Sequence, residues 1–349
     1  MKPKLYEEFE NFSQKILLSN HNGLKSKRDI LEADLKNKLP KILEDEEITI
    51  LNKSDLKFID QGSWAPGIKT SIKPKKQSEN GNKTFDRDVA IIIPLDINVN
   101  NDPRIIKKII RDILKIDGKR FPEIKNPCVT VNYSKEGDEI YHIDFPIYAK
   151  DLGGNLYLAK GKEFSSTYEW EQADPEGLNE YFRNHYEFEE GNQKRRIVRY
   201  IKQWKQEKYI CNNGSQIPPS IGLTLLVCNS FQPVFENGYW DDLKALYYVL
   251  QSILNKFVLY PDGNVDITCS LPRKPYSDVF FKMRNSQEHL KTFYNRLKNF
   301  AANIENAYNA EHAHEAAKYI VKSLGDQFEI PEKQAKLDNS SLKKEDRFA

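Results

Sequence analysis

Two aspartates, Asp86 and Asp88, stand two positions apart at the start of a run of apolar residues at 89–93. Side chains alternate faces along a β-strand, so these carboxylates project to the same side with Cα atoms roughly 6.5 Å apart. Paired carboxylates repel each other unless a cation lies between them, and hard divalent ions such as Mg²⁺ prefer oxygen ligands. An isolated Asp-x-Asp pair more often marks a solvated strand face. Here the apolar run that follows indicates a buried strand and favours a metal site where that strand begins.

A third carboxylate, Asp144, lies within the apolar stretch at 141–146, which we expect to form a strand of the same sheet. Three convergent carboxylates suit a two-metal site, in which one ion activates an attacking hydroxyl and the other stabilises a triphosphate and its leaving pyrophosphate. We therefore predict that Asp86, Asp88 and Asp144 are catalytic metal ligands for Mg²⁺ or Mn²⁺.

Two further features are candidates for phosphate binding. Gly62 and Ser63 follow a predicted strand at 57–61; glycine lets a backbone approach a phosphate closely, and the serine hydroxyl and amides then donate to it. Further along, a predicted helix places three basic residues on one face, at intervals of four and three: Arg195, Arg199 and Lys202. Such a face is either solvated or a phosphate clamp, and the pattern leaves both open.

The rest of the pattern predicts the elements that position these residues. In the first half we expect helices at 5–19, from 30 to near Pro40 or shortly after it, and at 104–116, with strands at 57–61, 85–95, 129–133 and 140–148. Beyond about residue 165 we expect helices at 176–187, 192–208, 219–231, 240–257, 285–309 and 312–323. Polar segments at 74–84 and from Glu332 onward are expected to be a loop and a tail. A mixed α/β half followed by a helical half predicts an active site in the cleft between two lobes.

The composition excludes several classes of protein. The 349 residues are 39% hydrophobic and 30% charged, and no apolar run approaches the roughly 18 residues that a membrane helix needs. The N-terminus lacks the apolar core of a signal peptide, so we expect a cytoplasmic protein. The four cysteines form no CxxC pair and are expected to be reduced thiols rather than a zinc site: Cys128, Cys211, Cys228 and Cys269.

The balance of basic and acidic residues indicates which kind of partner the protein binds. The chain has 53 basic and 51 acidic residues, a net charge of +2, whereas proteins that grip long nucleic acids usually show a strong basic excess. We therefore expect no stable nucleic-acid partner. A nucleoside triphosphate needs only a local basic cluster, which the chain has.

Several of these residues fall into motifs of known families. Gln61-Gly62-Ser63, Asp86-x-Asp88 and His142-Ile143-Asp144 together resemble the polymerase-β-like nucleotidyltransferase core. Four further segments narrow the resemblance to the bacterial CD-NTases, relatives of cyclic GMP-AMP synthase and the oligoadenylate synthases: Trp170-x-x-Ala173-Asp174-Pro175, Val198-Arg199-Tyr200-Ile201-Lys202-x-Trp204, Ile217-Pro218-Pro219-Ser220-Ile221-Gly222 and Leu324-Gly325-Asp326-Gln327-Phe328. The resemblance covers about residues 5 to 331 and is specific as a combination.

The resemblance implies an α+β fold of two lobes. A polymerase-β-like core with a mixed sheet and the N-terminal helices is expected at 1–160, a mostly helical lobe at 161–331 and a polar tail at 332–349. The donor triphosphate is expected at the turn Gln61, Gly62 and Ser63, with helical-lobe phosphate contacts from Lys202, Ser220 and Arg199. Two departures from the family pattern are the sequence Ala65-Pro66-Gly67-Ile68, where many relatives have Gly-Thr, and the length of the segment 63–86.

The function that the resemblance implies is synthesis of a cyclic di- or trinucleotide from nucleoside triphosphates, with release of pyrophosphate. ATP, GTP or both are the expected substrates. A separate effector protein would read the product in CBASS-type antiphage signalling. One alternative is a nucleotidyltransferase that extends an RNA end, modifies a protein or makes linear oligonucleotides. Another is a nucleotide-binding regulator without catalysis, which ranks last because all three carboxylates are present.

Overall fold

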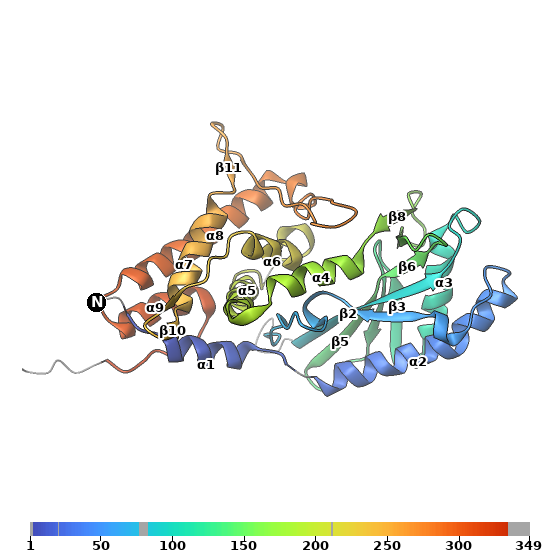
Figure 1. Cartoon of the computed structure of the whole chain (residues 1–349), viewed down its shortest axis with the longest axis horizontal. Coiled ribbons are helices and arrows are strands. Elements are labelled where there is room, and N and C mark those ends of the chain that lie inside the picture. The colour runs from blue at the N-terminus through green and yellow to red at the C-terminus, as the bar shows by residue number, and fades with distance from the viewer. Residues whose placement is uncertain (1–2, 20, 77–82, 211, 334–349) are drawn as a thin grey trace, which may run out of the picture.

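The computed structural model describes residues 3–19, 21–76, 83–210 and 212–333, and it divides into two regions (Figure 1). A sheet with helices α2 and α3 forms one end of the molecule, and helices α5 to α9 gather at the other. Helix α4 lies between them. The predicted mixed sheet and mostly helical second half are therefore confirmed.

The large sheet has eight strands within the described residues, in the order β3-β4-β5-β2-β6-β7-β8 with β1 paired to β2. Their bounds are β1 Lys57–Asp60, β2 Lys83–Pro94, β3 Arg120–Ile124, β4 Val129–Tyr133, β5 Glu139–Phe145, β6 Ile147–Lys150, β7 Leu156–Lys160 and β8 Glu169–Ala173. The sheet is mixed, because β2 pairs in parallel with β5 and β6 while its other pairings are antiparallel.

The central strand β2 organises this sheet. Lys83 pairs with Glu139 in β5, and Ile91 pairs with Ile147 in β6, so one register continues along β2 through Pro146. We expected a single strand at 140–148; the break falls at Pro146 because proline has no N–H to give to the ladder. β1 runs antiparallel along β2, from Lys57 opposite Ile92 to Asp60 opposite Val89.

The two faces of β2 meet different surroundings. Val89, Ile91 and Ile93 are fully buried in a core formed with α2 (Asn22–Asp45) and α3 (Pro103–Leu114). That core is built from the apolar stripes of the two helices, such as Leu31, Leu35 and Leu39 in α2. The opposite face of β2 carries Asp86 and Asp88 and is not covered by these two helices.

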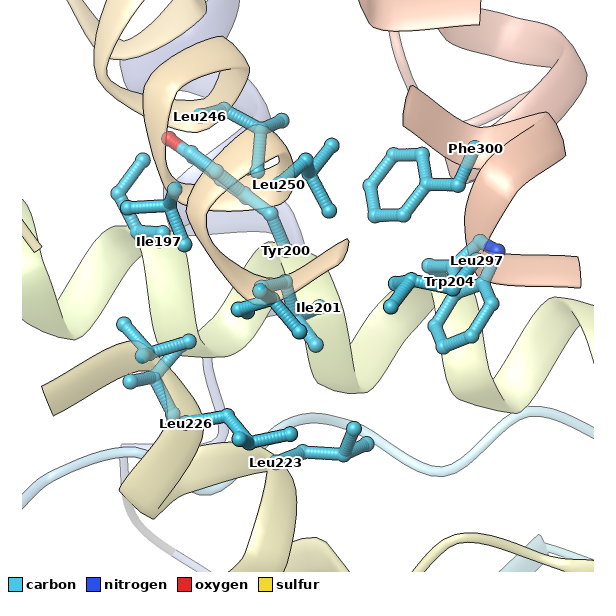
Figure 2. Close-up of a cluster of buried hydrophobic side chains, with 14 of the residues drawn as sticks. Ile197, Tyr200, Ile201, Trp204, Leu223, Leu226, Leu246, Leu250, Leu297 and Phe300 are labelled. Carbon is cyan, nitrogen blue, oxygen red and sulfur yellow. The ribbon is translucent and has the colours of Figure 1, made fainter. Parts of the chain in front are cut away.

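The helical region is built around one long helix, α5. The remaining helices are α1 Tyr6–Ile16, α4 Pro175–His185, α5 Phe188–Lys208, α6 Ser220–Cys228, α7 Asp242–Leu254, α8 Gln287–Asn309 and α9 Ala313–Leu324. Two short hairpins complete it: β9 Phe235–Glu236 with β10 Tyr239–Trp240, and β11 Val258–Leu259 with β12 Val265–Asp266. Figure 2 shows α5 between α6 on one side and α7 and α8 on the other, through Ile197, Tyr200, Ile201, Trp204, Leu223, Leu226, Leu246, Leu250, Leu297 and Phe300.

The hydrophobic cores follow the lobes only in part. Phe9, Phe12 and Ile16 of α1 are buried in the helical core, although α1 comes first in the sequence. Strand β8, beyond residue 160, pairs with β7 and so lies in the sheet. The boundary at residue 160 therefore does not separate the two regions fully, because α1 packs in the helical core and β8 belongs to the sheet.

Some expectations fall outside the described residues, namely most of the loop at 74–84, the tail beyond 333 and Cys211. The other cysteines, Cys128, Cys228 and Cys269, are buried free thiols, as expected. Among the described helices, none is long and apolar enough to span a bilayer.

Candidate active site

The parallel pairing of β2 with β5 brings the three predicted carboxylates together. Asp88 lies opposite Asp144 and Asp86 lies opposite His142, so Asp86, Asp88 and Asp144 share one face of the sheet. Burial, reinforced by the charges of Asp86 and Asp144, raises the pKa of Asp88 to about 7. The Oδ1 atom of Asp144 is buried and accepts no hydrogen bond in the described structure.

These observations fit a divalent cation. A buried acceptor without a donor is costly, and repelling carboxylates are costly as well; a hard cation relieves both. Within the described ranges, no group of three acidic, histidine or cysteine side chains already encloses a single ion position. The case for a divalent cation therefore rests on the three carboxylates being hard oxygen donors on one face of the sheet. Their side chains would have to rotate to surround one ion.

A cavity of about 630 Å³ opens over this face, between the sheet and the helical lobe. Seven of the nine predicted site residues line it: Gln61, Gly62, Ser63, Asp86, Asp88, Lys202 and Ser220. Asp144 does not line the cavity but lies beside Asp88 on the neighbouring strand. The volume falls in the range of ordinary small-molecule sites, roughly 300–1,000 Å³.

The turn after β1 lies directly against the carboxylates. Gly62 has a φ of 61°, and a Cβ at this position would lie 3.3 Å from Oδ2 of Asp88, so glycine permits the close approach. The backbone N–H of Gln61 donates to the carbonyl of Asp88 at 3.0 Å. The Ser63 hydroxyl accepts from Ser71 at 2.9 Å and keeps its own proton for another acceptor.

Two lysines of α5 supply positive charge from the helical side. Lys202 donates to the carbonyl and hydroxyl oxygens of Thr70, at 3.1 and 3.2 Å, and Lys205 donates to the Ser220 hydroxyl at 2.6 Å. Burial lowers the pKa of Lys202 to about 7, with a further lowering from the charge of Lys205. Burial also lowers the pKa of Lys205 to about 8. Two partly desolvated ammonium groups in one cavity are matched to a polyanion.

Lys205 was missed as a primary site residue. It stands three positions after Lys202, about one helical turn away, and this spacing is the signal that would have found it. The structure pairs Ser220 with Lys205 rather than with Lys202.

The structure places Arg199 outside the set of residues that line the cavity, so its geometry gives no support to the predicted phosphate contact. Its side chain is buried and donates to the carbonyl of Lys69 and to the Ser13 hydroxyl, at 3.0 and 2.7 Å. Arg195, on the same stripe, donates to the carbonyls of Gly67 and Ile68. The basic residues do share one face of α5, as predicted. Because α5 is covered by protein on most sides, that face lies largely against the backbone of 67–70. These arginines hold the loop that forms one wall of the cavity.

Comparisons with known proteins agree with this geometry. Residues 56–148, which contain the turn and all three carboxylates, match the family model described as cyclic GMP-AMP synthase DncV-like, nucleotidyltransferase domain. No curated protein matches by sequence.

Solved structures of one bacterial protein share the whole fold. The Vibrio cholerae DncV cyclic AMP-GMP synthase, a prokaryotic cGAS homologue, superposes with a TM-score of 0.66 at 17% identity, over 94% of this chain and 98% of that one. Its complex with the linear intermediate 5′ pppA(3′,5′)pG gives 0.68 at 16% identity, over 94% and 97% of the two chains. A GTP-bound form gives 0.64 at 16% identity with the same coverage. Residues 56–148 thus match the model of a DncV-like nucleotidyltransferase domain, and they lie within a fold that is similar along nearly its full length to that of the Vibrio cholerae enzyme.

Proposed function

We propose that this protein is a divalent-metal-dependent nucleotidyltransferase that joins nucleoside triphosphates into a cyclic di- or trinucleotide and releases pyrophosphate. One arrangement carries the proposal. A single cavity is bounded by the Gly62-Ser63 turn, the Asp86 and Asp88 carboxylates with Asp144 beside them, and the two lysines of α5.

Each group has a role in moving a nucleotidyl group. The backbone and hydroxyl of the turn donate to the triphosphate of the donor nucleotide, while Lys202 and Lys205 with Ser220 neutralise its charge from the opposite wall. The oxygen of the acceptor hydroxyl forms a bond to the α-phosphorus and loses its proton to solvent, while the bond from that phosphorus to the pyrophosphate oxygen breaks and pyrophosphate leaves. Positioning the two reactants in one cavity removes much of the entropic barrier of a bimolecular step.

The carboxylates would hold the metal, Mg²⁺ or Mn²⁺. When bound, such ions lower the pKa of the attacking hydroxyl and stabilise charge on the triphosphate and leaving group. Asp86, Asp88 and Asp144 supply the hard oxygen donors, and their mutual repulsion favours a state in which a cation is present.

Ring closure is favoured over chain growth by the charge of the protein. A linear polymerase needs a basic track for its growing product, and a net charge of +2 offers none of the required excess. A linear dinucleotide that keeps its 5′-triphosphate is able to return to the same cavity as donor. The Vibrio cholerae enzyme, solved with a linear intermediate that bears a 5′-triphosphate, supports this order of events for the shared fold.

The remaining assignments extend the proposal. ATP and GTP are the first substrates to test, because complexes of the Vibrio cholerae protein contain GTP or an intermediate of adenosine and guanosine. From the family resemblance we also propose a separate effector that reads the product and an antiphage role. The sequence at the N-terminus favours a cytoplasmic location. Transfer to an RNA end or to a protein remains the alternative, and a salt-sensitive RNA mobility shift would favour it.

The reaction class is tested by pyrophosphate release. The wild-type protein with nucleoside triphosphates and Mg²⁺ should release pyrophosphate, and chelation of the metal should stop it. The double variant Asp86→Asn with Asp88→Asn should lose release while its circular dichroism spectrum and thermal unfolding remain those of a folded protein. Full release by this double variant would contradict the metal-site assignment.

A further inference from the structure

One charged residue of β2, Arg87, lies on the buried, apolar face of the strand. Arg87 stands between the two predicted metal ligands and points to the opposite face, in line with the buried Val89, Ile91 and Ile93. Its side chain is only 11% exposed. A guanidinium in such a place is costly unless it is fully paired, so its partner is informative.

The partner is Asp60, the last residue of β1. Arg87 Nε donates to Oδ1 and Nη2 donates to Oδ2, both at 2.8 Å, which is the bidentate geometry that only arginine offers. Asn179 of α4, itself buried, donates to the carbonyl of Asp60 at 3.0 Å. The residue directly before the phosphate-binding turn is therefore fixed through both its side chain and its backbone.

The far end of the turn is fixed to the same strand. The guanidinium of Arg87 lies 5.3 Å from the ring centre of Trp64, which follows Gly62 and Ser63. Trp64 Nε1 donates to the carbonyl of Asp86 at 2.8 Å, while Gln61 at the near end donates to the carbonyl of Asp88. Both ends of the turn thus bond to the backbone of the two metal-ligand residues.

We propose that Arg87, Asp60 and Trp64 are positioning residues that hold the phosphate-binding turn in register with the metal carboxylates. The inference rests on the proposed function, since it assigns to these residues the alignment of the donor phosphate with the metal site. None of the three needs to touch the reacting atoms. A misplacement of about 1 Å costs on the order of a hundredfold in rate, so a small loosening of the turn is measurable.

The competing explanation is that this ion pair only stabilises the fold. A matched control separates the two, because the same lobe contains another buried arginine pair away from the turn. Arg120 in β3, 7% exposed, lies 2.7 Å from Asp34 of α2. Arg87→Lys and Arg120→Lys both keep the charge in a buried pair, although Arg87 makes two hydrogen bonds to its partner and Arg120 makes one. Tm is therefore measured for both, so that a loss of stability is separated from a loss of positioning.

The test compares Arg87→Lys, Asp60→Asn and Trp64→Phe with Arg120→Lys, below the Tm of every variant. Trp64→Phe keeps an aromatic ring at this position, removes the N–H donor together with part of the indole, and leaves the buried ion pair intact, so it guards against a folding failure of the other two. We expect kcat for pyrophosphate release to fall at least tenfold in each of the three, with a raised Mg²⁺ requirement. Arg120→Lys should lower Tm and leave kcat within twofold of wild type.

A binding measurement without turnover completes the design. Calorimetry with Mg²⁺ and a non-hydrolysable ATP or GTP analogue should show at least tenfold weaker binding in Arg87→Lys than in Arg120→Lys. Equal binding and equal kcat in these two variants would overturn the positioning role. A wild-type protein that binds the analogue but releases no pyrophosphate would instead contradict the proposed function, while the binding comparison would still decide the positioning role.

Discussion

Lys205→Met is expected to weaken binding of the nucleoside triphosphate and at the same time to stabilise the nucleotide-free protein. Lys205 lies in the cavity, donates to Ser220 at 2.6 Å and feels the charge of Asp86. Methionine keeps the length and most of the volume of the side chain while removing the charge. The change therefore isolates what the ammonium group does.

The magnitudes follow from its surroundings. A charge-assisted hydrogen bond to a phosphate contributes about 1.5–3 kcal/mol, so KM for the nucleoside triphosphate should rise roughly 10- to 150-fold. Burial lowers the pKa of Lys205 from 10.5 to about 8, which means that the folded protein without ligand disfavours the charge. Stability should therefore increase in the variant, and the gain should be complete below pH 8 and vanish towards pH 10.5, where the lysine is neutral in both states.

Thermal unfolding of the nucleotide-free protein at pH 7, beside steady-state pyrophosphate release, measures both effects. Lys208→Met is the control, because Lys208 is exposed at the end of the same helix and donates to the carbonyl of Lys322 outside the cavity. Its KM should stay within twofold of wild type and its Tm should not rise. A Lys205→Met protein that loses stability and keeps its KM would refute the reasoning, because the ammonium would then be a structural group.

Two further outcomes are expected. At limiting Mg²⁺ and saturating nucleoside triphosphate, whose negative charge keeps Lys202 protonated, pyrophosphate release should increase with pH through about 7, because burial and the neighbouring carboxylates hold the Asp88 proton to that pH. Excess Mg²⁺ should shift the midpoint of the pH–rate profile downward, and a midpoint that does not depend on the metal concentration would contradict the carboxylate assignment. Arg199→Met should lower Tm, because it leaves the Lys69 carbonyl and the Ser13 hydroxyl without their donor, while KM stays near wild type; a normal Tm with a large rise in KM would return Arg199 to phosphate binding.

The central strand and its carboxylates were predictable because their signals are local. An apolar run of Val and Ile indicates a buried strand, and the two-residue spacing places Asp86 and Asp88 on one face whatever the rest of the chain does. The register that brings Asp144 opposite Asp88 depends on how β2 and β5 pair in the folded protein, which the local sequence does not determine. The sequence predicted only that Asp144 lies on a strand of the same sheet.

Other features depended on neighbours that the sequence does not identify. Periodicity assigned Arg199 to a polar stripe of α5, but α5 is packed on several sides, so part of that stripe contacts the backbone of the 67–70 loop. Strand β8, with the polar sequence of 169–173, has no apolar alternation and becomes a strand through pairing with β7. Helix α2 passes through Pro40 and ends at Asp45, because its leucines at 31, 35, 39 and 43 remain buried against the sheet.

Arg87 is a further residue whose role the sequence does not reveal without its partner. Alternation places it on the apolar face of β2, where a charge conflicts with the pattern. Only the position of Asp60 at the end of β1 explains why the charge is tolerated there.

The identity of the product tests the central claim most directly. The protein is incubated with labelled ATP, GTP, CTP and UTP and Mg²⁺ or Mn²⁺, the mixture is treated with phosphatase, and the surviving labelled species is weighed by mass spectrometry. We predict a phosphatase-resistant species whose mass equals the sum of its nucleoside monophosphates minus one water for each linkage. A ladder of phosphatase-sensitive products would contradict ring formation, and it would make the protein a linear oligonucleotide synthase.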